Sequence, residues 1–117
     1  MTIDEVENEI YEVADRFPFI SNIETLMKTP NTIKIKLYIT ASCFIQIYQN
    51  IQKKVRNYVI VCGNQRLFGR DCDGGKWHCH PLDEPDSHDF SEDGAIEVSL
   101  EDFLYEAGEK LIIIGIL

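Results

Sequence analysis

Hydrophobic residues recur with helical spacing at both ends of the chain. Near the start, Thr2 and Glu5 have the spacing of a capping box, and an apolar stripe follows them. The stripe consists of Ile3, Val6, Ile10, Val13, Ala14 and Phe17. We expect this helix to end near Arg16, because Pro18 disfavours helical backbone in the residue before it. A second stripe after Ser99 predicts a C-terminal helix and consists of Leu100, Phe103, Leu104, Ala107 and Leu111.

Between the two helices, apolar and polar residues alternate with the period of a half-buried strand. The alternation predicts strands at 32–39 and 43–48, and two further strands are predicted at 55–62 and 65–72. Gly63 and Asn64 suit a tight hairpin turn, and residues 20–29 fit either a short strand or a helical turn. The predicted fold class is α+β: residues 1–117 form a single domain with an antiparallel meander of about four to six strands, packed by an N-terminal and a C-terminal helix.

The last seven residues, 111–117, are apolar apart from Gly115. This run is far below the roughly 20 residues that a membrane-spanning helix needs. It predicts either a strand that completes the sheet or an exposed docking tail. The sequence therefore predicts no association with a membrane.

Charge is unevenly distributed along a chain whose net charge is −9. Composition is 44% hydrophobic and 26% charged, which is typical of a globular domain. Residues 1–27 carry seven acidic residues and one basic residue. Residues 28–76 carry only two acidic residues but nine basic ones, and residues 77–117 carry eleven acidic residues and one basic residue. The predicted sheet is therefore basic, which permits a local anionic ligand such as RNA. The alternative is that these lysines only solvate the open face of the sheet and protect its edges.

No apolar segment of a secretory signal follows the acidic start of the chain, which predicts a cytoplasmic protein. In that compartment the four cysteines are expected to be reduced thiols or metal ligands rather than disulfides. Cys43 and Cys62 fall on predicted strands, where we expect them to be small buried hydrophobic residues.

Residues 69–88 carry all three histidines, the only tryptophan and two of the four cysteines. The surrounding acidic residues, glycines and prolines predict a shaped loop. On extended backbone, His78 and His80 project to one side and Cys79 to the other. This segment is the strongest candidate for chemistry, because imidazole titrates near neutral pH and ligates metals.

Several short motifs between about Lys34 and Leu104 follow one another in a recognisable order. They are Ser42 beside a turn, the strand Tyr58-Val59-Ile60, the strand end Arg70-Asp71, the loop Trp77-His78-Cys79-His80-Pro81 with His88 downstream, and the segment Val98 to Leu104. This arrangement resembles the TumE family, small toxin components of type II toxin–antitoxin pairs. The resemblance implies a toxin that acts on RNA or on translation and that binds an antitoxin.

For an enzyme that cleaves RNA without a metal, we expect His78 and His80 to serve as general acid and base on the ribose hydroxyl and the leaving oxygen. Arg70 or Arg66 would stabilise the charge on the phosphate. The RNA itself would be bound by Lys34, Lys36, Lys53, Lys54, Arg56, Arg66 and Trp77.

Two alternatives remain open at the level of sequence. The first is a four-coordinate zinc site, although the spacing matches no recognised zinc finger. Its candidate ligands are His78, His80, His88, Cys72, Cys79, Asp71 and Asp73. The second is a non-catalytic binding or regulatory module, with or without a stabilising metal, that works through a protein partner or as a homo-oligomer. Replacing His78 and His80 separates these functions, because only the enzyme depends on both as acid and base.

Overall fold

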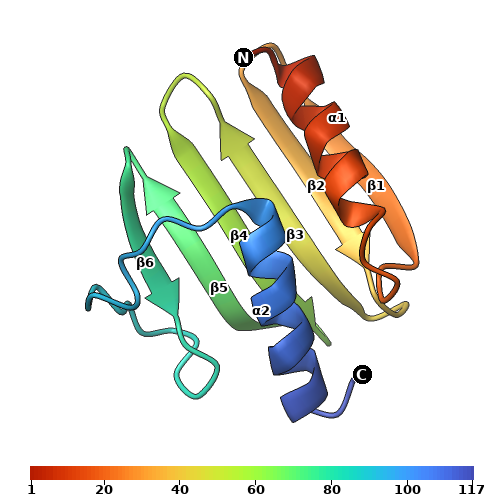
Figure 1. Cartoon of the computed structure of the whole chain (residues 1–117), viewed down its shortest axis with the longest axis vertical. Coiled ribbons are helices and arrows are strands. Elements are labelled where there is room, and N and C mark those ends of the chain that lie inside the picture. The colour runs from red at the N-terminus through yellow and green to blue at the C-terminus, as the bar shows by residue number, and fades with distance from the viewer.

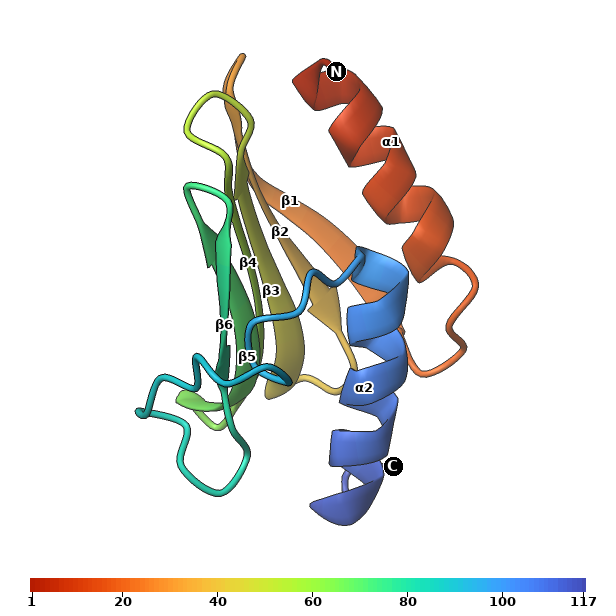
Figure 2. The ribbon, with the colours of Figure 1, turned by 60° about the vertical axis from the view of Figure 1, so that its left-hand side comes forward.

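Each strand pairs with the strand that follows it in the sequence, so one antiparallel sheet has the order β1-β2-β3-β4-β5-β6. The computed structural model describes all 117 residues. Its elements are α1 (Ile3–Ala14), β1 (Asn22–Lys28), β2 (Thr32–Tyr38), β3 (Cys43–Asn50), β4 (Val55–Cys62), β5 (Gln65–Asp73), β6 (Lys76–His80) and α2 (Leu100–Ile113). Both helices lie against the same face of the sheet (Figures 1 and 2). The predicted α+β meander with a helix from each end of the chain is confirmed.

The hydrophobic core lies between the two helices and one face of the sheet. Along β2 and β3, every second residue is buried and its neighbours are half-buried, which is the burial pattern that alternation predicts. Phe103, Leu104 and Leu111 of α2 are fully buried against this face. The other face carries no helix, and we call it the open face; Lys34, Gln46 and Asn57 lie on it.

Polar side chains cap both helices at their N-termini. Thr2 with Glu5, and Ser99 with Asp102, form complete capping boxes, as the sequence predicted. At the other end of α2, the N–H of Gly115 donates to the carbonyl of Ile112, and Gly115 has a φ of 82°. The next residue donates to the carbonyl of Leu111, which completes a Schellman motif.

The C-terminal run therefore does not form the strand that was predicted as one of its two alternatives. Residues 111–113 are the last turn of α2, because the apolar stripe of the helix continues to Leu111. The side chains beyond Leu111 are mostly exposed, with Ile112 at 64% and Ile113 at 69%. Neither helix is long and apolar enough to cross a membrane.

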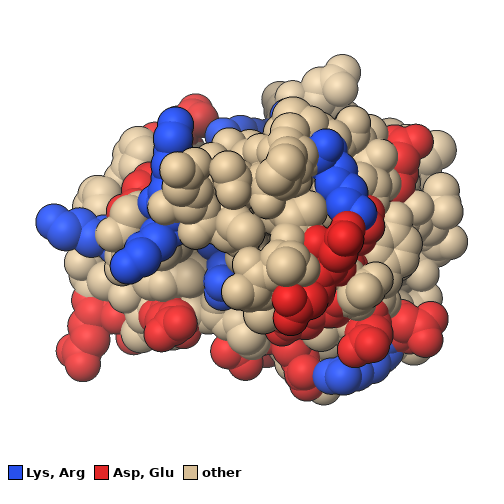
Figure 3. All heavy atoms as spheres, turned by 90° about the horizontal axis from the view of Figure 1, so that it is seen from above, with Lys and Arg blue, Asp and Glu red and all other residues tan.

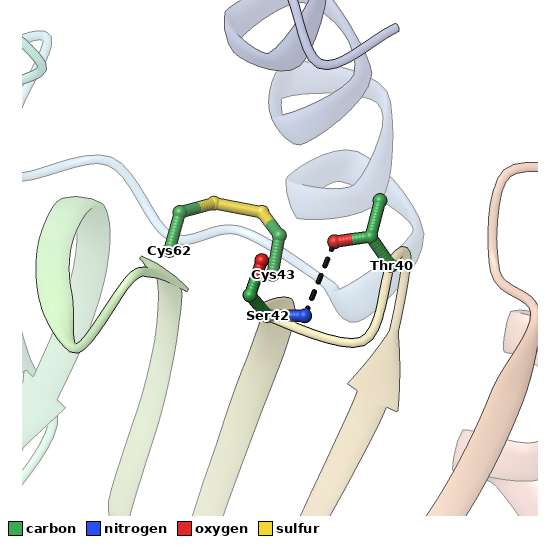
Figure 4. Close-up of a disulfide and its surroundings, with 4 residues drawn as sticks. All are labelled: Thr40, Ser42, Cys43 and Cys62. Carbon is green, nitrogen blue, oxygen red and sulfur yellow. Dashed lines mark hydrogen bonds between the residues drawn. A yellow bond between two sulfur atoms is a disulfide. The ribbon is translucent and has the colours of Figure 1, made fainter.

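Cys43 and Cys62 are joined by a disulfide (Figure 4). They are directly opposite each other on the antiparallel strands β3 and β4. Just before Cys43, the N–H of Ser42 donates to Thr40 Oγ1 at 3.3 Å. The expectation that all four cysteines are reduced or metal-bound is thus wrong for this pair, because it took no account of strand register. Cys72 and Cys79 are free and buried.

The two free thiols should react slowly with alkylating agents while the protein is folded. Burial raises the pKa of both Cys72 and Cys79, and only the thiolate is a good nucleophile. We expect iodoacetamide at pH 8 to label neither residue in native protein and both after denaturation in urea. Peptide mapping by mass spectrometry measures this. Rapid labelling of the native protein would show that these thiols are not buried.

Candidate metal centre

Asp71, His78 and His80 are brought together by the pairing of β5 with β6. Asp71 is opposite His78, and Gly69 is opposite His80, which leaves room beside the His80 ring. Because side chains alternate along a strand, all three functional groups project to the open face. Arg70 and Cys79 project to the face that carries the helices. The predicted orientation of the two histidines on one side and Cys79 on the other matches the structure.

The functional groups of these three residues form a tight triangle. His78 Nε2 lies 3.2 Å from His80 Nε2. Asp71 Oδ2 lies 3.1 Å from His80 Nε2 and 3.5 Å from His78 Nε2. The site is largely shielded from water, since Asp71 is 8% exposed and His78 is 6% exposed.

His88 completes the group from the segment that follows β6. The N–H and carbonyl of Cys79 pair with the carbonyl and N–H of Asp89, at 3.0 and 2.8 Å, so the chain returns beside β6. This return places the ring of His88 4.6 Å from that of His80 and 5.0 Å from that of His78, measured between centroids. One ring nitrogen from each histidine then lies within 4.8 Å of the others. The ring of Phe90 packs against His78 at 5.1 Å.

The hydrogen bond of His80 fixes which of its ring nitrogens can accept a cation. A carbonyl oxygen can only accept, so His80 Nδ1 must donate to the carbonyl of Pro85, 2.9 Å away. In a neutral imidazole, Nε2 then carries a lone pair, and it faces the lone pairs of Asp71 Oδ2 at 3.1 Å. This contact is satisfied by a proton on His80, by the Nε2–H of His78 at 3.2 Å, or by a metal ion between the atoms.

Three features favour a metal ion in that position. Burial lowers the pKa of His78, which favours the neutral form that ligates metals. Asp71 Oδ1 is buried and has no hydrogen-bond partner, so the carboxylate is not held by a network of protein donors. The bond from His80 Nδ1 to a backbone carbonyl is also the usual way in which a protein orients a ligating histidine.

The separations match those of a tetrahedral zinc site. Bonds of 2.0–2.1 Å from zinc to nitrogen or oxygen place tetrahedral ligands about 3.3–3.4 Å apart. The observed separations among Asp71, His78 and His80 run from 3.1 to 3.5 Å. His88 is the most exposed of the three histidines, and one of its ring nitrogens lies within 4.8 Å of the other two.

Cys72 and Cys79 do not belong to this group, although both were predicted as candidate zinc ligands. Each lies on the face of the sheet that packs against the helices and is part of the hydrophobic core. Trp77, predicted to stack on RNA bases, is also in the core at 9% exposure, with its ring 6.3 Å from that of Tyr58. These predictions took no account of which face each residue occupies.

Arg70 is bound within the protein and does not face the histidines. Its Nε and one terminal nitrogen donate to the two carboxylate oxygens of Glu106, each at 2.8 Å. Its other terminal nitrogen donates to the carbonyl of Asp93, also at 2.8 Å. The predicted role of Arg70 as a phosphate ligand is therefore wrong for this structure, because every guanidinium nitrogen has a partner in α2 or in the segment before it.

The bidentate pair of Arg70 and Glu106 should contribute measurably to stability. Changing Glu106 to Gln removes the charge partner of an arginine whose side chain is only 9% exposed. We expect the free energy of unfolding to fall by about 2 kcal/mol, since one hydrogen bond and the bond to Asp93 remain. Urea denaturation measures this loss. The control is Glu109→Gln on the exposed side of α2, and equal effects of the two changes would contradict the role of the pair.

The predicted RNA-binding residues divide between two faces and one turn. Lys34 and Arg66 lie on the open face, where they line a shallow cavity of about 340 Å³ together with Tyr48 and Asn57. Lys36 lies on the same face, with its Nζ 4.2 Å above the ring of Phe44. Lys53 and Lys54 are in the turn between β3 and β4, and Arg56 lies on the face that carries the helices.

The structure thus brings together all three predicted histidines and Asp71, but only part of the basic set. Pro85 and Phe90 complete the surroundings of the histidines and were not predicted, because nothing in the sequence indicates how residues 81–98 fold back.

No protein-family model matches the chain, and no curated protein or solved structure shows significant similarity to it.

Proposed function

We propose that this protein is a metal-stabilised module that holds one zinc-type divalent ion between Asp71, His78, His80 and His88. The observation that carries the proposal is the convergence of Asp71, His78 and His80 at separations of 3.1 to 3.5 Å, with a ring nitrogen of His88 within 4.8 Å of the other two histidines. Three imidazoles and one carboxylate are ligands that zinc accepts readily. A site with four protein ligands is closed and therefore has a structural role.

The metal would connect parts of the chain that few other contacts connect. Asp71 comes from β5, His78 and His80 come from β6, and His88 comes from the segment between β6 and α2. That segment is otherwise attached by the backbone pairing of Cys79 with Asp89, by the bonds from Arg70 to Asp93 and from His80 to Pro85, and by the packing of Val98 in the core. A bound ion would fix residues 81–98 against the sheet and so present a defined surface to a partner.

Zinc titration of the purified, chelator-treated protein tests this proposal. We expect one equivalent of zinc to bind to the wild type, and cobalt to give the intense visible absorption of a tetrahedral complex. His80→Ala and His88→Ala should each weaken zinc binding at least about tenfold to a hundredfold. Asp86→Asn, an exposed acid in the same segment, is the matched control and should bind as the wild type does. Failure to bind zinc, or equal binding by all four proteins, would contradict the proposal.

A second candidate is the metal-independent cleavage of RNA that the sequence analysis predicted for a toxin-like protein. It is supported by the contact between His78 Nε2 and His80 Nε2 at 3.2 Å, and by Lys34 and Arg66 on the same face. Arg66 takes the place of Arg70 as the phosphate ligand in this mechanism. In this case the positive charge beside Asp71 is a proton on His80, which would serve as the general acid.

A ribonuclease assay in the presence of EDTA separates the two candidates. The enzyme requires cleavage that persists in the chelator and is lost in the protein carrying both His78→Ala and His80→Ala. If no cleavage depends on these histidines, the ribonuclease is excluded and the metal-stabilised module is the function that the structure supports. For both candidate functions we expect a protein partner, either an antitoxin or a second copy of the chain, and this stays a prediction.

A further inference from the structure

A second concave site lies on the opposite face of the sheet from the metal centre. Neither helix covers the ends of β4, β5 and β6 nearest the β3–β4 turn, where only the segment leading into α2 crosses the sheet (Figure 1). A cavity of about 560 Å³ occupies this region, and a smaller one of about 160 Å³ adjoins it. Both volumes together are in the range of a site for a small organic molecule.

The floor of the larger cavity is a row of neighbours across four strands. Gln49 pairs with Arg56, Arg56 pairs with Cys72, and Cys72 pairs with Trp77. All four line the cavity, which is therefore built from the rigid sheet. Trp77 and Cys72 give one end of the row an apolar surface, and Gln49 and Arg56 give the other end polar groups.

No side chain in this row makes an ion pair, although Arg56 lies beside the hydroxyl of Tyr58. Gln49 continues the buried row of β3 and is only 9% exposed, yet its side chain makes no hydrogen bond in the structure. Arg56 makes no ion pair, and neither does Lys54, which lines the cavity from the β3–β4 turn with a φ of 55°. The amide of Gln49 is open to the cavity, where it can hydrogen-bond a ligand, and the cations beside it attract an anion.

The charge of the cavity is positive although the molecule is acidic. The lining of the larger cavity holds Lys54 and Arg56 against a single acid, Glu97, and the smaller cavity adds Glu9. The space-filling view from above shows several basic side chains gathered on one side, and acidic side chains mainly on the other side and along the lower edge (Figure 3). The local sign is thus opposite to the net charge of −9.

We propose that this cavity binds a small organic anion that has a flat apolar body and one carboxylate, sulfonate or phosphate group. The apolar body would lie against Trp77, and the anionic group would accept hydrogen bonds from Arg56, Lys54 and the amide of Gln49. The site is independent of the proposed metal centre, since it uses the opposite faces of β5 and β6.

Trp77 provides a local signal for the test, because it is the only tryptophan in the chain. The probe is 8-anilinonaphthalene-1-sulfonate, and its neutral analogue without the sulfonate is the comparison. We expect the sulfonate to quench Trp77 with saturation at one equivalent, and the neutral compound to bind at least about tenfold more weakly.

Variants assign the binding to this cavity. Arg56→Gln and Lys54→Gln should each weaken binding of the sulfonate about tenfold, as the loss of one charge-assisted hydrogen bond requires. Lys76→Gln, which is at the same end of the sheet but outside the cavity, should bind as the wild type does. The proposal is overturned if the wild type does not bind the probe, if the neutral compound binds equally well, or if both cavity variants retain the wild-type affinity.

Discussion

Zinc at about a thousand times its dissociation constant is expected to raise the free energy of unfolding of the wild type by about 4 kcal/mol. The reason is that the folded state assembles four ligands from β5, β6 and the segment after β6, whereas the unfolded chain holds them apart. Thermal denaturation with and without zinc, followed by circular dichroism, measures the shift. The expected change is a rise in the melting temperature that depends on zinc concentration.

The His80→Ala variant is the decisive comparison for this effect. It removes the ligand whose Nδ1 donates to the carbonyl of Pro85 and whose Nε2 faces Asp71. Its melting temperature should not respond to zinc, while Asp86→Asn should respond as the wild type does. An equal response of His80→Ala and the wild type would place any zinc elsewhere in the protein.

Replacing Phe103 with alanine is expected to lower the free energy of unfolding by about 3–5 kcal/mol. Phe103 is fully buried where α2 meets the sheet. Its ring centroid lies 5.3 Å from that of Tyr58 and 5.9 Å from that of Phe68, so its removal leaves a cavity between two aromatic rings that rigid strands hold in place. Urea denaturation at equilibrium measures the loss.

The matched control is Ile112→Ala, farther along the same helix. Ile112 is 64% exposed, so its truncation should change the free energy of unfolding by less than about 0.5 kcal/mol. A small effect of Phe103→Ala, equal to that of the control, would mean that α2 is not packed on the sheet as described.

The regular alternation of side chains is the reason why most of the sheet could be predicted. Strands β2 and β3 have a buried face and a half-buried face, and the period shows this directly. Strand β1 is an edge strand with few buried residues, so residues 20–29 gave no clear pattern. The apolar run at 111–117 was ambiguous for another reason, because hydrophobicity alone does not distinguish a helix end from a strand over so few residues.

The candidate site was predictable where it depends on neighbours in sequence. The spacing of His78 and His80 placed them on one face, because side chains alternate in any strand. The position of His88 depends on how residues 81–98 fold back, and the pairing of Arg70 with Glu106 spans 36 positions. The disulfide of Cys43 with Cys62 required the register of β3 and β4. None of these contacts is encoded in a local pattern.

X-ray absorption at the zinc edge, on protein loaded with one equivalent of zinc, tests the proposed metal centre most directly. The account predicts a first coordination shell of nitrogen and oxygen only, at about 2.0–2.1 Å, with the outer-shell scattering of imidazole rings. A sulfur ligand at about 2.3 Å would contradict it, because Cys72 and Cys79 lie on the other face of the sheet. Protein that retains no zinc to measure would contradict it as well.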